Sequence, residues 1–220
     1  MNYYAHGYRF VHDPCFLAGT SVPDWLSIIN RRVRARRRLA EPWTEDADPM
    51  VRAVARGIVQ HHHDDAWFHV TRAFAELSLA LTVGVREHLA GDPGFRPSFL
   101  GHILVEVFLD AALIEANPDR LVQYYAALES LDSERVSEII QRMTTGPVPG
   151  LEGVIPRFCR ERFLYDYLDD AKLLARLNRV MGRVKLPVLP ESFVAFLPTA
   201  RQLVTARCDE LMSEPKPLPN

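Results

Sequence analysis

Histidines and acids gather in one short stretch of the chain, GIVQHHHDDAWFH (57–69). Residues four apart lie on one face of an α-helix, so His61, Asp65 and His69 are expected to form a stripe. The flanking residues are largely apolar, and a buried helix holds this many ionisable groups only when they pair with each other or bind metal. A single pair of this kind is more often structural than functional.

A second stripe is predicted in GHILVEVFLD (101–110), where His102, Glu106 and Asp110 are again four residues apart. The other sides of this helix are apolar, so it is expected to be buried. Each stripe offers the partners that the other needs, with a divalent cation between them. Imidazoles combined with several carboxylates favour Mn or Fe over a structural Zn.

The N-terminal segment offers two further polar groups. His6 lies among aromatic residues, and Asp24 follows Pro23 at the expected start of a helix. An aspartate at that position also caps a helix N-terminus without any other role, and this alternative stays open.

A run of arginines, NRRVRARRRLAEP (30–42), is the strongest charge feature of the sequence. It can be the solvated basic end of a helix, which the helix dipole favours. Arginine also pairs bidentately with phosphate and carboxylate, so the run is expected to recruit an acidic protein or a phosphorylated substrate. RNA binding is disfavoured because no aromatic residues are interleaved with the run.

The overall composition is that of an ordinary globular protein. The chain has 220 residues, 48% of them hydrophobic, and a formal net charge of −2, which by itself points to neither a nucleic-acid nor a membrane partner. Three widely spaced cysteines give no disulfide framework and no cysteine-based zinc motif. No signal-like start and no apolar run of about 18 residues is visible, so a cytoplasmic location is expected.

Hydrophobic periodicity predicts an all-α, single-domain helical bundle over residues 1–213, with residues 214–220 as a disordered tail. Helices are expected at 22–39, 48–90 (as one or two helices), 96–117, 118–131, 132–145, 157–184 and 190–213. The loop 145–156, rich in Gly and Pro, is the one plausible internal seam.

Three motifs resemble those of the acyl carrier protein phosphodiesterase family. Its opening motif is matched by Met1, Asn2, Tyr3, Ala5 and His6, followed by Leu17, Gly19 and Asp24. Its second motif is matched by Gly57, Ile58, His61, Asp65 and Trp67, and its third by Glu106, Asp110 and Leu113. The chain departs from the family at three positions: His69 and Glu106 each stand where the family has Asp, and Ala111 stands where it has His.

The resemblance implies an HD-domain-like, metal-dependent phosphohydrolase that removes the 4′-phosphopantetheine arm from holo-acyl carrier protein. It implies one or two cations, Mn before Fe or Zn, held by His6, Asp24, His61 and Asp65, with Asp110 or Glu106. His102 or His62, with Glu106, would orient water or protonate the leaving oxygen. The arginines Arg31, Arg32, Arg34 and Arg38 would bind the substrate at the rim.

Two alternatives stay open at the level of sequence. One is a non-catalytic helical scaffold or binding protein that keeps a metal site for structure. The other is a different metal-dependent hydrolase, similar to phospholipase C. The sequence also leaves open which residue of His61, His62 and His63 is a ligand.

Overall fold

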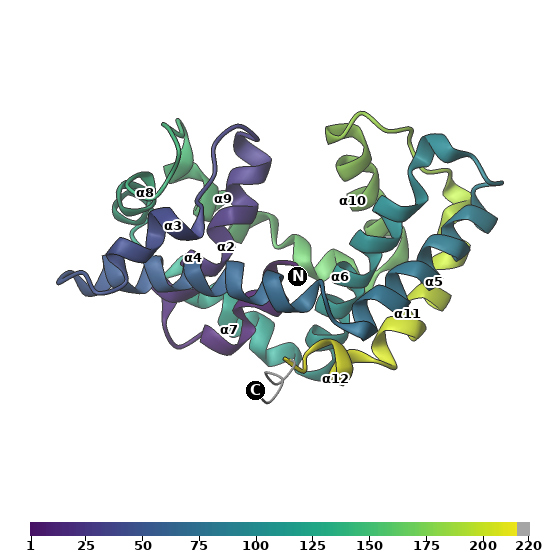
Figure 1. The fold of residues 1–220 in the computed structure, drawn as a ribbon, viewed down its shortest axis with the longest axis horizontal. Coiled ribbons are helices and arrows are strands. Elements are labelled where there is room, and N and C mark those ends of the chain that lie inside the picture. The colour runs from purple at the N-terminus through teal and green to yellow at the C-terminus, as the bar shows by residue number, and fades with distance from the viewer. Residues whose placement is uncertain (215–220) are drawn as a thin grey trace, which may run out of the picture. The chain divides into compact units, whose positions relative to one another are not determined.

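Helices are the only regular elements in the computed structural model, which describes residues 1–214 (Figure 1). The longest are α2 (Pro14–Ile29), α4 (Pro49–Phe68), α5 (Arg72–His88) and α6 (Pro97–Ala116). Shorter helices are α1 (Tyr3–Gly7), α3 (Arg37–Ala40), α7 (Pro118–Glu129), α8 (Ser133–Gln141), α9 (Val154–Glu161), α10 (Asp170–Arg183), α11 (Leu197–Thr205) and α12 (Cys208–Leu211). The predicted all-α class is confirmed. None of the described helices is both long and apolar enough for a membrane crossing.

The described chain divides into two compact units. Unit 1 comprises Met1–Ala66 and Asn117–Arg162, and unit 2 comprises Trp67–Ala116 and the chain from Phe163 onward. The expected seam, 145–156, lies inside unit 1. The single domain over 1–213 stays a prediction, and of the expected tail 214–220 all but Glu214 lie outside the described residues.

The N-terminal helix boundary differs from the predicted one. Helix α2 begins at Pro14, where the side chain of Asp13 accepts a hydrogen bond from the Phe16 backbone N–H at 3.0 Å. Pro23 therefore lies inside α2, and Asp24 follows it within the helix. The alternative that Asp24 caps a helix is wrong, because Asp13 takes that role.

The arginine run is not helical over most of its length, which corrects the predicted helix 22–39. Residues 30–36 follow the end of α2 without helical structure, and Val33 and Ala35 are buried while Arg34 and Arg36 are exposed. This alternation has the period of an extended chain rather than that of a helix. Helix α3 then takes up Arg37 and Arg38.

The predicted helix 48–90 is two helices, α4 and α5, and the predicted helix 157–184 is interrupted. The side chain of Thr71 caps α5 by accepting from the Phe74 N–H at 3.2 Å. Helix α9 ends at Glu161, and the next residue, Arg162, has a φ of 42° in the left-handed region. Asp169 then caps α10. In the predicted helix 190–213, the α-helical segments are α11 and α12. Helix caps and one left-handed residue thus interrupt helices that the hydrophobic periodicity predicted as continuous.

Helices α2 and α4 meet at two glycines. A Cβ atom on Gly57 would lie 2.8 Å from the Cα of Gly19 and 2.9 Å from the Thr20 backbone nitrogen, and it would collide with the carbonyl of Phe16. Side chains are absent from this contact, so one backbone packs directly on the other. The crossing places the carbonyl of Thr20 beside the side chain of His61, one turn further along α4.

In unit 2, helix α6 packs against α5 and α11 (Figure 1). Gly101 lets α6 approach α5 closely: a Cβ atom there would lie 2.8 Å from the Ser78 carbonyl oxygen. Leu81 of α5 and Leu104 and Phe108 of α6 are fully buried. This packing fixes the face of α6 that carries His102 and Glu106.

Candidate metal centre

Three predicted ligands converge in unit 1. His6 comes from α1, and His61 and Asp65 come from successive turns of α4. The Nε2 atom of His6 lies 3.4 Å from Asp65 Oδ1, and the Nε2 atom of His61 lies 3.5 Å from Asp65 Oδ2. The two imidazole rings stack with centroids 4.0 Å apart. One ligand atom of each residue lies within 4.8 Å of the other two, which suits a single cation.

The other ring nitrogen of each histidine is already occupied. His61 Nδ1 lies 2.8 Å from the Thr20 carbonyl oxygen, which can only accept, so this nitrogen carries the hydrogen. His6 Nδ1 lies 3.1 Å from Asp64 Oδ2, and the other oxygen of that carboxylate, Oδ1, accepts a hydrogen bond from Gln60 at 2.7 Å. Metal-binding histidines are typically oriented in this way, through a carbonyl or a carboxylate on the far nitrogen.

The Nε2 nitrogen of His6 is buried and lacks a hydrogen-bond partner among the described residues. The residue as a whole is 1% exposed. A buried polar atom without a hydrogen bond is costly, and a bound cation would remove that cost. The donor set of two imidazoles and a carboxylate therefore fits a first-row divalent metal.

The charges of the metal-free group are set by burial and by neighbouring groups. Burial alone would lower the pKa of His6, but Asp64 and Asp65 outweigh it and raise that pKa to about 9. Burial and the neighbouring charge of His6 hold the pKa of His61 well below its usual value. Burial opposes ionisation of Asp65, yet its ion pairs with His6 and with the Met1 amino group, 2.7 Å away, hold its pKa below the usual range.

These charges predict how cation binding depends on pH. A cation on His6 Nε2 must displace a proton with a pKa of about 9, whereas His61 is already neutral. Between about pH 7 and pH 9, the apparent affinity for Mn²⁺ is expected to rise about tenfold per pH unit. Calorimetry in two buffers of different ionisation enthalpy should show release of about one proton per cation.

The same proton contributes to the stability of the metal-free fold. Because the pKa of His6 is raised from 6.5 to about 9, its contribution is complete below about pH 6.5 and is lost as the pH rises through about 9. For the cation itself, an affinity for Mn²⁺ that stays constant between about pH 7 and pH 9 would contradict the assignment of His6 as a ligand.

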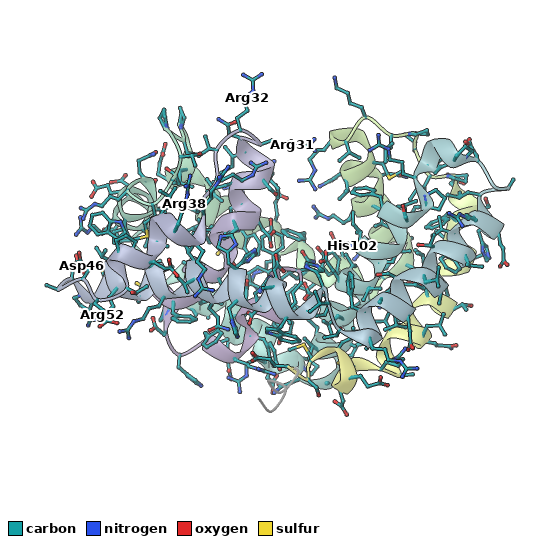
Figure 2. All side chains as sticks on the ribbon, viewed as in Figure 1. Arg31, Arg32, Arg38, Asp46, Arg52 and His102 are labelled. Carbon is teal, nitrogen blue, oxygen red and sulfur yellow. The ribbon has the colours of Figure 1, made fainter. Side chains whose placement is uncertain are left out.

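A second group of donors lies in unit 2. His69 Nε2 lies 2.9 Å from Glu106 Oε1, and His102 Nε2 lies 3.3 Å from the same oxygen. Burial opposes ionisation of Glu106, and hydrogen bonds from His102 and His69 favour it, with the result that its pKa is lowered. His102 and Glu106 also line an open hollow of about 740 Å³. Figure 2 labels His102 on α6.

The residues of the two predicted stripes therefore form groups other than the expected ones. His69 follows the last residue of α4, so it does not continue the stripe of His61 and Asp65, and it joins His102 and Glu106 instead. Asp110 is fully buried in α6 and belongs to neither group. Asp24 also lies outside both groups. One cation shared by both stripes stays a prediction.

The side chain of His62 contacts the arginine run. Its Nε2 atom lies 2.7 Å from the Ala35 carbonyl oxygen, so the ring anchors the extended part of the arginine run to α4. On the other side, Thr145 bonds both the N–H and the carbonyl of Arg34. These bonds hold the extended segment in place, and the catalytic role of His62 stays a prediction.

The arginine run is exposed, and most of it has no acidic partner. Arg37 pairs with Glu41 at 2.8 Å. Within residues 1–214, no ion pair with an acidic side chain is formed by Arg31, Arg32, Arg36 or Arg38. Figure 2 shows Arg31 and Arg32 just beyond the end of α2, and Arg38 on α3. A hollow of about 410 Å³ in the same unit is lined by Phe16, Arg37, Arg56, Val59, Gln60 and His63.

Sequence reasoning missed Asp64 and Thr20, which orient the two histidines. Asp64 is one residue from a predicted ligand and lies on another face of α4, so helical spacing from His61 did not select it. Its burial, with 8% exposure, could be known only from the packing of α1 on this helix. The Thr20 contact involves a backbone atom, which leaves no trace in residue types.

Comparisons with models of protein families, with curated proteins and with solved structures find no match for this chain.

Proposed function

We propose that this protein is a metal-dependent phosphodiesterase whose cation is held by His6, His61 and Asp65. The observation that carries the proposal is the orientation of the two imidazoles. Each uses Nδ1 for a hydrogen bond and directs Nε2 towards the same carboxylate. Mn²⁺ is the cation we expect, with Fe²⁺ or Zn²⁺ as alternatives for this mixed nitrogen and oxygen donor set.

The chemistry follows from an incomplete ligand set. A divalent cation with open positions supplies Lewis-acid activation of a phosphoryl oxygen and of water. Three protein donors leave such positions, and the Asp65 side chain is 33% exposed, so solvent reaches the group from that side. Asp64 and Thr20 keep the imidazole rings in the binding orientation.

The proposed substrate is a phosphodiester carried on an acidic protein, with holo-acyl carrier protein as the first candidate. The resemblance of the three sequence motifs supports this choice. The exposed Arg31 and Arg32 provide the positive charge that a phosphorylated acidic partner needs. In the hollow of unit 1, by contrast, Arg37 and Arg56 are already paired with Glu41 and Glu45. Gln60 lines this hollow and also bonds Asp64, which places the hollow next to the candidate centre.

The test is hydrolysis of bis(p-nitrophenyl) phosphate and of holo-acyl carrier protein by the full chain loaded with Mn²⁺. Chelation by EDTA and the Asp65→Asn substitution should each abolish both activities. Asp119→Asn is the matched control, because Asp119 is an exposed carboxylate of unit 1 outside the group. A chain that binds cation but hydrolyses neither substrate would support the scaffold alternative.

The same assay tests the role of the arginines. The double variant Arg31→Glu/Arg32→Glu should raise the KM for holo-acyl carrier protein at least about tenfold at low salt and leave hydrolysis of the small substrate unchanged. Arg179→Glu is the control, since Arg179 is exposed and lies on α10, outside the run. An equal effect on both substrates would contradict protein recognition by this segment.

A further inference from the structure

The donors in unit 2 have the geometry of a binding site in their own right. Two imidazole Nε2 atoms, from His69 and His102, converge on one carboxylate oxygen of Glu106 at 2.9 and 3.3 Å. One ligand atom of each residue lies within 4.8 Å of the other two. Two of the donors are one turn apart on α6, and the third comes from the turn after α4.

The two rings are fixed by packing as well as by Glu106. The imidazoles stack with centroids 5.0 Å apart and planes 24° apart. The ring of Phe74 lies edge-on to both of them, 4.9 Å from each centroid, and Phe74 is itself buried. The donors are therefore held in place before any ligand arrives, which lowers the entropic cost of binding.

This group is open to solvent, unlike the buried histidines of unit 1. The His69 side chain is 30% exposed and that of His102 is 44% exposed. The adjoining hollow is also lined by Arg96 and by Ser98 at the start of α6. Water or a small anion can reach this group and complete the coordination of an ion held there.

We propose that His69, His102 and Glu106 form a second divalent-cation site, which takes Zn²⁺ or a similar first-row cation through two imidazole nitrogens and one carboxylate. Two nitrogens and one oxygen with open positions are a recurrent donor set for such cations. The proposal rests on residues separate from those of the proposed hydrolytic centre. The alternative is that the three side chains only hydrogen-bond to one another.

The experiment is equilibrium dialysis of the chelator-stripped full chain against Zn²⁺, with the bound metal counted by elemental analysis. The His61→Ala variant, which removes a ligand of the unit 1 group, should retain about one Zn²⁺ per chain. Adding His69→Ala and His102→Ala to it should remove that Zn²⁺. His88→Ala is the control, because His88 is an exposed histidine of the same unit that bonds the Gly84 carbonyl outside the group.

A second measurement covers the case in which His61→Ala does not fold. In the otherwise unmodified chain, Glu106→Gln should weaken binding of one equivalent of Co²⁺, seen in its visible absorption, by at least about tenfold. If His69→Ala/His102→Ala binds as much Zn²⁺ as the unmodified chain, the site does not exist. The number of Zn²⁺ ions bound by these variants does not depend on whether Asp65→Asn loses hydrolysis. A failure of the second site can therefore be distinguished from a failure of the proposed hydrolytic function.

Discussion

Replacing Gly57 with alanine is expected to destabilise the protein by about 3 kcal/mol, although alanine is the better helix former by about 1 kcal/mol. The reason is the backbone contact between α4 and α2. The added methyl group would meet Phe16 and Thr20 main-chain atoms, which cannot rotate away, so the helices must separate. Urea unfolding followed by circular dichroism measures the free-energy change.

Gly182→Ala is the matched control for this substitution. Gly182 is also helical, in α10, but a Cβ atom there meets nothing within 4 Å, so the change should stabilise the protein by about 0.5 kcal/mol. Opposite signs for the two variants support the close crossing. A Gly57→Ala protein as stable as the unmodified chain would contradict it. The variant should also bind Mn²⁺ more weakly, because separation of the helices withdraws Thr20 from His61.

The His61→Ala substitution is expected to lower the Mn²⁺ affinity of the unit 1 group more than about 100-fold, since groups that merely orient a ligand already contribute 10–100-fold. His61 contributes one of three donors, and its loss also leaves the Thr20 carbonyl without its imidazole partner. Calorimetric titration with Mn²⁺ at fixed pH measures the change.

The neighbouring histidines provide the controls for that prediction. His62→Ala and His63→Ala should bind Mn²⁺ as the unmodified chain does, because His62 bonds Ala35 and His63 is exposed. His62→Ala should instead loosen the extended arginine segment. If His63→Ala lost the cation and His61→Ala kept it, the ligand assignment would be wrong.

Helical spacing correctly indicated which polar side chains share a face within a helix. The pairs His61 with Asp65 and His102 with Glu106 are each one turn apart, and both pairs are present. Spacing carries no information beyond the end of the helix, and for that reason His69 was assigned to the wrong group. Where α4 stops depends on Thr71, whose capping hydroxyl starts the next helix.

The predicted helix over residues 22–39 was wrong for two physical reasons. Pro23 suggested a helix start, because proline is favoured in the first turn, whereas here it lies inside a helix that Asp13 had already begun. Further on, Val33 and Ala35 follow a period of two, but six arginines around them, all good helix formers, hide that alternation. Burial of these two small apolar residues decided the local structure.

The structure explains why glycines stand in the first two motifs: they allow two helices to touch. Gly19 and Gly57 were selected only by resemblance, and they mark the place where α2 and α4 touch. Such a contact between residues 38 positions apart in the sequence cannot be read from local patterns. The orientation of His61 depends on it, through the carbonyl of Thr20.

The bond between His61 and Thr20 joins two helices that have no contact in an unfolded chain. A cation that needs this orientation binds the folded form alone, so binding and folding are thermodynamically linked. At a hundred times its dissociation constant, such a cation adds about 2.7 kcal/mol to the free energy of unfolding. The melting temperature measured with each cation at the same concentration therefore ranks the affinities of Mn²⁺, Fe²⁺ and Zn²⁺ for the folded chain.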